Sequence, residues 1–450
     1  MPKRNPRSDV TARPDDYVEG SGDSGYRVHH YSLDLDYRVA TNRLTGTATL
    51  EAVARGDIAS IRLDLEGLSV SKVLVDGAKP AQYRQGATAV AVTLAEPLAT
   101  GTAFTVVVRY TGDPAPRDSA WGEVGWEELT EGVLVAAQPN GAPTWFPCND
   151  VVGDKATYRI AVTAESEYTV VANGSCTSTR KVGSRTTRVF EMTEPMSTYL
   201  ATVQIGVYRQ LRALDTPEGS ATVVQRSYVP GDLLDDFGAD FAAQPHMMQL
   251  FERMFGPYPF ASYTVVVTDD ELEIPLEAGG MSTFGRNHVD GHGGSQRLIA
   301  HELAHSWFGN SVTAASWRHI WLHEGFACYA EWLWSEHSGG PSAQRLATGF
   351  WANLSALDTD IVIGDPGPDL MFDDRLYKRG ALTLHALRLT LGDDTFFDML
   401  RAWTGDHRHG SVTTDDFVEH LDRFSPEPLG DFVRAWVFES ALPKLPRAGR

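Results

Sequence analysis

The chain has 450 residues, 42% of them hydrophobic and 22% charged, which is typical of a globular protein of two or three domains and excludes a disordered or fibrous chain. A formal net charge of −20 argues against non-specific binding to nucleic acid, because the phosphate backbone would be repelled. No apolar run approaches the roughly 18 to 20 residues that span a bilayer, and no secretory signal is recognisable, so we expect a cytoplasmic protein without a membrane partner.

The N-terminal half is predicted to be β-structure. Residues 1–25 are polar and lack a periodic apolar pattern, so we expect a mobile tail. In YSLDLDY, which begins at residue 31, Leu33 and Leu35 alternate with polar residues, as in a half-buried strand. Similar short segments, separated by Gly, Asp, Asn or Pro, continue to about residue 212. The pattern predicts an antiparallel, all-β domain over residues 26–212.

The C-terminal half is predicted to be mainly helical. From residue 232 the apolar spacing becomes helical, and a single β-rich run, YTVVVTDDEL, follows from residue 263. Beyond residue 294 the helical pattern covers residues 294–308, 324–337, 376–391, 395–403, 413–423 and 429–439. We therefore predict a second domain over residues 213–450 and an α+β fold class for the chain.

The segment HELAHSWFGN, which begins at residue 301, raises the question of a metal site. His301 and His305 are four residues apart, so on a helix both imidazoles can point to one position. Glu324, in the next helical segment after 18 intervening residues, offers a carboxylate as third ligand. Three ligands of this kind leave a fourth zinc position open, which is the pattern of a catalytic zinc. We predict one zinc ion (Zn2+) per chain, held by His301, His305 and Glu324.

Glu302 directly follows the first of these histidines. Its carboxylate is expected to project beside the open zinc position rather than toward the ligands. There it can accept a proton from a zinc-bound water during attack on a carbonyl and then deliver it to the leaving amine. The motif therefore predicts a zinc hydrolase with Glu302 as general base.

These motifs resemble those of the zinc aminopeptidase family that includes aminopeptidase N and the leukotriene hydrolases, the gluzincins with HExxH and a distant glutamate. HELAHSWFGNSV and WLHEGFACYAEWLWSE look like the two zinc helices of that family, and TWFPCND looks like a motif late in its N-terminal β domain. The resemblance implies a thermolysin-like, mainly helical catalytic domain after an antiparallel β domain. Many members continue into a helical C-terminal domain, which we expect this chain to lack.

The resemblance also implies roles around the zinc. Tyr377, in YKRG, matches the family tyrosine that hydrogen-bonds the oxyanion of the intermediate. His319 and His323 depart from the family, which usually has Asp and Asn at these positions. Neighbours of this kind orient metal ligands and adjust their basicity, so the effect of both histidines is left open.

Substrate binding is expected near IPLEAGGMST. Glu277, 24 residues before the first zinc histidine, lies where the family has a glutamate that binds the substrate amine. A second register places Ser282 at that position, and we favour Glu277 because a cationic amine needs an anionic partner. Gly279 and Gly280 are expected to contact the substrate as well. Gln138 matches the position from which the β domain contacts the N-terminal residue of the substrate.

The leading hypothesis is a zinc aminopeptidase that releases N-terminal residues from peptides with a free N-terminus. An endopeptidase, or a zinc hydrolase of another small substrate such as an epoxide, is a first alternative, favoured if blocked peptides are also cleaved. A zinc-containing peptide-binding protein with weak catalysis is a second alternative, which a peptidase assay distinguishes. The preferred N-terminal residue, the physiological substrate and the oligomeric state are left open.

Overall fold

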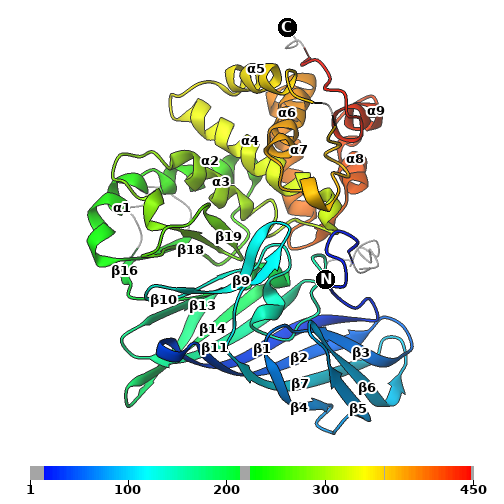
Figure 1. Cartoon of the computed structure of the whole chain (residues 1–450). Helices are drawn as coiled ribbons and strands as arrows, with labels where there is room; N and C mark the ends of the chain where they lie inside the picture. The colour runs from blue at the N-terminus through cyan, green and yellow to red at the C-terminus, as the bar shows by residue number, and fades with distance from the viewer. Residues whose placement is uncertain (1–14, 213–222, 359, 447–450) are drawn as a thin grey trace. The chain divides into compact units, whose positions relative to one another are not determined.

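The computed structural model describes residues 15–212, 223–358 and 360–446 (Figure 1). Contacts within the chain divide these residues into two compact units. The first unit contains residues 15–212, 224–233 and 261–287, and the second contains 223, 234–260, 288–358 and 360–446. The predicted domain boundary after residue 212 borders residues 213–222, which lie outside the described ranges.

The first unit is built from sheets, as the alternating sequence pattern predicts. Its largest sheet has the strand order β13-β14-β11-β1-β2-β7-β4. These strands are β1 (Tyr26–Arg38), β2 (Arg43–Ala54), β4 (Ser69–Val75), β7 (Ala103–Gly112), β11 (Ala156–Glu165), β13 (Ser175–Val182) and β14 (Arg185–Met196). Leu33 and Leu35 in β1 are buried whereas Asp34 and Asp36 are exposed, so one face of this strand packs on the core. Most pairs are antiparallel, but β1 and β11 run parallel.

Two smaller sheets complete the N-terminal part of this unit. One has the order β12-β15-β10-β9-β8, with β8 (Arg117–Ser119), β9 (Gly122–Leu129), β10 (Gly132–Ala136), β12 (Thr169–Ala172) and β15 (Val203–Gly206). The other has the order β3-β6-β5, with β3 (Ile58–Asp64), β5 (Gln82–Gln85) and β6 (Ala89–Leu98). Buried aromatic residues pack edge to face between strands, as with Tyr37 and Trp126, whose ring centroids lie 4.9 Å apart.

The polar N-terminal segment is packed in its described part, contrary to the expected mobile tail. Tyr17 and Val18 are buried, and the backbone N–H of Gly22 donates to the Asp64 carboxylate at 2.8 Å. These two apolar residues are too few to form a periodic pattern, so the sequence did not reveal their burial. Residues 1–14 of the predicted tail lie outside the described ranges.

A further five-stranded sheet of the first unit carries Glu277. Its order is β16-β17-β18-β20-β19, with β16 (Arg209–Arg212), β17 (Val224–Val229), β18 (Ser262–Val267), β19 (Leu276–Ala278) and β20 (Met281–Phe284). Most of these residues lie in the range 213–450, which was predicted to form the second domain. By contacts they group with the first unit, in which the backbone of Gly279 bonds both Leu200 and the side chain of Asn173.

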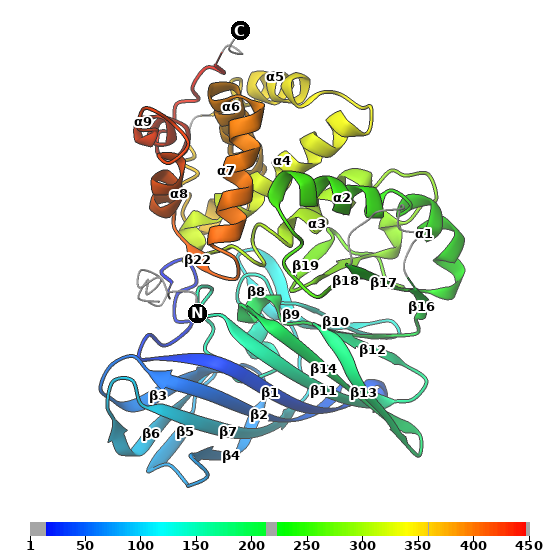
Figure 2. The ribbon, with the colours of Figure 1, turned by 180° about the vertical axis from the view of Figure 1, so that it is seen from behind.

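The second unit is mainly helical, as predicted (Figure 2). Its helices are α1 (Leu234–Asp240), α2 (Gln244–Phe255), α3 (Gln296–His305), α4 (Trp321–His337), α5 (Ala343–Leu354), α6 (Asp374–Leu391), α7 (Asp393–Asp406), α8 (Thr414–Leu421) and α9 (Gly430–Val433). A π-helical turn, η8 (Arg434–Phe438), continues α9, and a short parallel pair joins β21 (Thr313–Ala314) to β22 (Ser411–Val412). No helix of the described ranges is both long and apolar enough to span a bilayer.

One helix of this unit was missed by the sequence analysis. The helix α5 follows Ser342, whose hydroxyl accepts the backbone N–H of Arg345 and so caps the helix. The segment was assigned no element, although Ser342 is an N-cap signal. Because only Ala343 and Ala347 of α5 are buried, its apolar stripe is short.

Candidate metal centre

The helices α3 and α4 of the second unit bring three side-chain donors together. Nε2 of His301 lies 3.4 Å from Oε2 of Glu324, and Nε2 of His305 lies 3.5 Å from the same oxygen. All three side chains are buried or nearly so. Within the described part of the chain, they form the one group of three His, Cys, Asp or Glu side chains whose donor atoms lie within 4.8 Å of one another.

The other nitrogen of each imidazole is already engaged. Nδ1 of His301 lies 2.8 Å from Oε1 of Glu331, and Nδ1 of His305 lies 3.0 Å from the carbonyl oxygen of Phe308. A carbonyl oxygen can only accept a hydrogen bond, so Nδ1 of His305 carries the hydrogen and Nε2 has the lone pair. The same tautomer fits His301 against the Glu331 carboxylate, so both Nε2 atoms can act as metal ligands.

These donor distances fit a zinc ion. With bonds of about 2.0 to 2.1 Å, two ligands of a tetrahedral zinc lie about 3.3 Å apart, and the separations of 3.4 and 3.5 Å are close to this value. In this tautomer, His301 and His305 each direct the N–H of Nδ1 to an oxygen, which is the usual arrangement of metal-binding histidines. The three predicted ligands are thus brought into a suitable geometry, and their role stays a prediction.

The chain after α3 is shaped to keep His305 in place. Gly309 has φ of +115°, a conformation that side-chain-bearing residues rarely adopt. A β-carbon at this position would lie 3.3 Å from Nδ1 of His305 and 3.4 Å from the ring of His323. The aromatic rings of Phe308 and Phe326, 4.6 Å apart, pack the end of α3 against the start of α4.

Glu331 links His301 to the guanidinium of Arg297. It lies two helical turns after Glu324 on α4, and its carboxylate accepts hydrogen bonds from both His301 and Arg297. The guanidinium of Arg297 lies 3.1 Å from both carboxylate oxygens. Arg297 is four residues before His301 on α3, so α3 and α4 are joined by an ionic contact directly behind the donor group.

Glu302 has an oxygen that is available for chemistry. The side chain is buried, and its Oε2 atom has no hydrogen-bond partner among the described residues. A buried carboxylate oxygen without a partner is costly, so its presence points to a group that binds there in the working protein. Burial raises the pKa of Glu302 to about 7.

The carboxylates of this site stabilise positive charge. Burial alone would lower the pKa of His301, but its contacts with Glu324 and Glu331 raise it to about 10. Burial lowers the pKa of His305 to about 4, so this ring is neutral near pH 7. The same carboxylates would stabilise a metal cation at the position where the donors converge, and His301 would then bind it as a neutral imidazole.

Tyr377 lies close to the donor group. It is in the first turn of α6, and its ring centroid is 6.2 Å from that of His301, with the two planes inclined by 18°. Asp373 caps this helix by accepting the backbone N–H of Arg375, which fixes where α6 begins. The structure therefore brings Tyr377 next to the predicted ligands within one unit.

The two histidines that depart from the family pattern make structural contacts. Nε2 of His323 accepts the backbone N–H of Ala314 at 2.7 Å, and Nδ1 of His319 lies 3.0 Å from the hydroxyl of Thr414. His323 thus bonds the strand β21, and His319 bonds the start of α8. Burial lowers the pKa of His319 to about 4.

The first unit brings the predicted substrate-binding residues Gln138 and Glu277 together. Nε2 of Gln138 donates a hydrogen bond to Oε1 of Glu277 at 2.7 Å, although 139 positions separate the two residues. Both side chains line one cavity of this unit, together with Val135, Ala136, Ala137, Tyr199, Thr202, Leu276, Ala278 and Thr283. The structure thus brings Gln138 and Glu277 into contact, and the binding of a substrate amine by Glu277 stays a prediction.

Ser282, the rival candidate for the amine anchor, and the two glycines Gly279 and Gly280 are all buried. Ser282 is fully buried and lies 2.6 Å from the hydroxyl of Tyr263. Gly279 donates its backbone N–H to Leu200 and accepts from Asn173, and the carbonyl of Gly280 accepts the N–H of Thr264. These hydrogen bonds give the backbone of both glycines a structural role. Contact of the two glycines with a substrate stays a prediction.

Sequence reasoning missed the residues behind the ligands. Glu331 was not singled out, although its spacing of seven residues from Glu324 puts both on one face of a helix. Arg297 could have been noted for the same reason, four residues before His301. The carbonyl of Phe308 left no signal, because a backbone acceptor has no side chain that identifies it.

Models of known protein families match most of the chain. The N-terminal domain of peptidase family M1 matches residues 27–200, and the peptidase family M1 domain matches residues 240–436. Aminopeptidase M1-A of Oryza sativa subsp. japonica is 28% identical over 331 residues, which are 68% of this chain and 37% of that protein. Probable aminopeptidase 2 of Sulfurisphaera tokodaii is 26% identical over 328 residues, which are 67% of this chain and 40% of that protein. The chain thus spans less than half the length of these curated relatives.

Solved structures match over nearly the full length. A zinc metallopeptidase of family M1 from Deinococcus radiodurans has 30% sequence identity and a TM-score of 0.88, and the match covers 97% of this chain and 99% of that chain. A mutant of a Deinococcus radiodurans M1 zinc metallopeptidase bound to a Tyr-Ser-Ala substrate matches with a TM-score of 0.87 and 30% identity, over 95% of this chain and 98% of that chain.

Proposed function

This chain belongs to peptidase family M1. We therefore propose that it is a zinc-dependent aminopeptidase that releases N-terminal residues from peptides. The proposal depends above all on the second unit, where three donors converge beside an unpartnered oxygen of Glu302. The curated relatives are named aminopeptidases, and one solved relative was bound to a tripeptide, which supports a peptide substrate.

The donor side chains of His301, His305 and Glu324 would hold one zinc ion per chain. A zinc ion bound there supplies a Lewis acid that polarises a carbonyl oxygen and makes water more acidic. Glu331 keeps the ring of His301 in the orientation and tautomer that metal binding needs. The three ligands carry one formal negative charge, so the site would keep a net positive charge toward the substrate carbonyl.

Glu302 is proposed to move the proton. Its Oε2 atom accepts a proton from the attacking water and later donates it to the nitrogen of the leaving amine. The buried position of Glu302 supports this role, because a carboxyl of raised pKa is a better base than an exposed one and still ionises near neutral pH.

Tyr377 is proposed to stabilise the charge that develops on the substrate carbonyl. Its hydroxyl donates a hydrogen bond to the oxygen as negative charge forms in the transition state. The ring stands beside that of His301, which keeps the hydroxyl within the same site as the predicted ligands. A donor of this kind affects the rate of the reaction more than the binding of substrate.

Glu277 and Gln138 are proposed to bind the substrate's N-terminus. The α-ammonium group has three N–H donors and a positive charge, and Glu277 offers a carboxylate while Gln138 offers an amide oxygen. The hydrogen bond from Gln138 holds the Glu277 carboxylate in place before substrate arrives. Such an anchor would select the first peptide bond for hydrolysis and disfavour blocked peptides.

Metal removal tests this proposal. We expect one equivalent of zinc in the purified protein by elemental analysis, and activity on an aminoacyl-fluorophore substrate that disappears with a strong chelator and returns with added zinc. Protein that hydrolyses this substrate with no stoichiometric metal would contradict a zinc mechanism. Protein that holds zinc and binds peptides without cleaving them would favour the peptide-binding alternative.

A further inference from the structure

The helices α4 and α6 of the second unit come into backbone contact at a pair of glycines. A β-carbon added to Gly380 would lie 2.6 Å from Cα of Gly325, and one added to Gly325 would lie 2.8 Å from Cα of Gly380. Non-bonded carbon atoms lie about 3.5 to 4.0 Å apart at their optimum, so neither position accepts a side chain without separating the helices. The obstacle in each case is backbone, which cannot turn aside as a flexible side chain can.

This glycine contact is close in the sequence to a proposed metal ligand on α4 and to Tyr377 on α6. Gly325 directly follows Glu324 on α4, and Gly380 lies three residues after Tyr377 on α6. Residues three apart on a helix share a face, so Tyr377 projects from the side of α6 that meets α4. The distance between the two helices at this point therefore determines how far the Tyr377 ring stands from Glu324 and His301.

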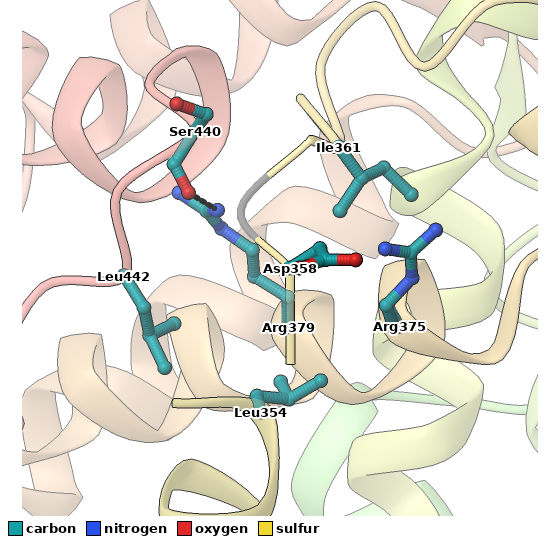
Figure 3. A pocket seen from close by; sticks show the side chains of 7 residues that line it. All are labelled: Leu354, Asp358, Ile361, Arg375, Arg379, Ser440 and Leu442. Atoms are coloured by element: carbon teal, nitrogen blue, oxygen red, sulfur yellow. Dashed lines mark hydrogen bonds between the residues drawn. The ribbon is translucent and has the colours of Figure 1, made fainter. Parts of the chain in front are cut away.

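A second set of contacts holds the same stretch of α6 from another direction. The buried guanidinium of Arg379 donates hydrogen bonds to backbone carbonyl oxygens, at 2.8 Å to Trp436 and 2.7 Å to Ser440, and also to Ala435, Glu439 and Ala441. Figure 3 shows Arg379 bonded to Ser440 at the edge of a pocket that Arg375 also lines. We call this set of bonds the Arg379 clasp.

The Arg379 clasp joins α6 to a segment that is itself well fixed. The backbone N–H of Gly364 donates to the carbonyl of Val437 at 2.9 Å, and the indole of Trp351 donates to the carbonyl of Pro443 at 2.7 Å. The Arg379 clasp therefore ties the first turns of α6 to η8 and to the residues that follow η8. The same turns of α6 contact α4 through Gly325. Since Arg379 stands two residues after Tyr377, both restraints act on the tyrosine's own part of the helix.

We propose that the Gly325–Gly380 contact and the Arg379 clasp are positioning elements that hold the Tyr377 hydroxyl where the charged oxygen of the transition state forms. This inference rests on the proposed function, in which Tyr377 stabilises that oxygen. Neither glycine nor Arg379 touches the reacting atoms, and all three act through the placement of Tyr377.

The size of the effect follows from the geometry. A methyl group at Gly380 needs about 1 Å of extra separation to restore ordinary carbon contacts. A displacement of about 1 Å at a catalytic group costs about 100-fold in rate. Gly380→Ala should therefore lower kcat about 100-fold with little change in KM, while zinc content stays that of the parent protein.

A double-mutant cycle with Tyr377→Phe tests this inference. Tyr377→Phe alone should lower kcat by roughly 10² to 10³. If Gly380→Ala acts through the tyrosine hydroxyl, it should have almost no further effect in the Tyr377→Phe background, because the hydroxyl is already absent. Gly349→Ala is the matched control, since this exposed glycine of α5 has no atom within 4 Å of an added β-carbon and kcat should stay near the parent value.

Arg379→Lys gives the second arm, which decides the matter if Gly380→Ala does not fold. Lysine keeps the charge but cannot reach several carbonyls at once, so kcat should fall in the parent and not in the Tyr377→Phe background. Losses that multiply in both double mutants would overturn the inference while leaving the role of Tyr377 intact. A Tyr377→Phe variant with normal kcat would instead contradict the proposed role of Tyr377, and the inference would fail with it.

Discussion

Among single residues, Glu302 has the environment that most limits its possible roles. Its carboxylate is buried, next to a metal-ligand candidate, and one oxygen has no partner in the described ranges. A solvated surface glutamate would have neither property. The proposed role as proton acceptor accounts for both.

We predict that Glu302→Gln keeps the zinc and lowers kcat by about 10² or more. Glutamine preserves the shape of the side chain and its hydrogen bonding but cannot take the proton from water. Elemental analysis and steady-state kinetics on the same preparation would measure both quantities. Turnover near that of the parent protein would remove Glu302 from this role.

Glu277 decides between the two registers left open by the sequence. Loss of a partly buried charged partner costs about 2 to 5 kcal/mol, so Glu277→Ala should lower kcat/KM for free peptides by roughly 30-fold to several thousand-fold. Hydrolysis of acetylated peptides, which lack the ammonium group, should scarcely change. Kinetics with matched free and acetylated substrates would measure both effects.

Ser282→Ala is the matched control for this prediction. The buried hydroxyl bonds Tyr263, so its removal should cost about 1 kcal/mol of stability and leave kcat/KM near the parent value. A crippling effect of Ser282→Ala together with a mild effect of Glu277→Ala would reverse the assignment.

Among the site residues, the sequence identified those that a short motif or a fixed spacing along the chain reveals. His301, His305 and Glu324 follow from helix geometry and a fixed spacing, and the structure brings their donor atoms together. Glu277 and Gln138 were each proposed through the family resemblance, and the hydrogen bond between them was not predicted. Such a contact depends on how distant strands pair, which periodicity does not encode.

The helices α3 and α4 are joined by the contacts of Glu331 with His301 and Arg297, and the effect of Glu331 on metal binding can be tested. We predict that Glu331→Ala weakens zinc binding by about 10 to 100-fold, because His301 loses the acceptor that fixes its ring and tautomer. Competition with a chromogenic chelator would measure the zinc dissociation constant.

Glu336→Ala is the control on the same helix. Glu336 also forms an ion pair, with Arg388 at 3.1 Å, but it bonds no histidine of the site. Its removal should leave the zinc dissociation constant unchanged. Equal losses in the two variants would mean that α4 as a whole, rather than the Glu331 contact, determines metal affinity.

The elements that the sequence predicted best are those with a strong apolar period. The strand β1 and the helices α3, α4 and α6 lie within a few residues of their predicted ranges. The helix α5 was missed because its buried stripe is short, and the predicted helix over 429–439 is α9 followed by a π-helical turn. Carbonyls of this turn bond Arg379, an interaction that no local pattern reveals.

For the molecule as a whole, a buried carboxylate in the first unit predicts a pH dependence of stability. Asp150 is buried, and only its Oδ1 atom has a hydrogen bond, from Thr198, among the residues described. Burial first, and then the nearby charge of Asp64, raise the pKa of Asp150 from 3.8 to about 7, against the opposing effects of Thr198, Arg117 and Arg62.

The sign of the dependence follows from where the proton is held. Between about pH 4 and pH 7 the folded protein keeps a proton on Asp150 that the unfolded chain has released. The free energy of unfolding should therefore fall as pH rises through this range, by up to about 4 kcal/mol from this group.

Asp150→Asn should remove this dependence, because the amide does not ionise. Relative to the parent, the variant should gain stability from about pH 5 to about pH 8 in urea unfolding. Asp118→Asn, at an exposed aspartate of the same unit, should leave the pH profile unchanged. A parent profile parallel to that of Asp150→Asn would show that Asp150 is ionised when folded.

Along the whole chain, the order of a β-rich part followed by a helical part was predicted from the sequence and is confirmed. The grouping of the sheet that carries Glu277 with the first unit was not. Its strands lie beyond residue 208 in the sequence, and only long-range pairing decides with which unit they pack.

We propose that this chain is a zinc aminopeptidase that binds the free amine of its substrate. The most direct test is kcat/KM of the zinc-loaded protein for one aminoacyl-fluorophore, free and N-acetylated. We expect acetylation to lower kcat/KM by about 30-fold or more, because it removes the charge that Glu277 would bind. Equal rates on the two substrates would contradict the amine anchor and favour an endopeptidase or another zinc hydrolase.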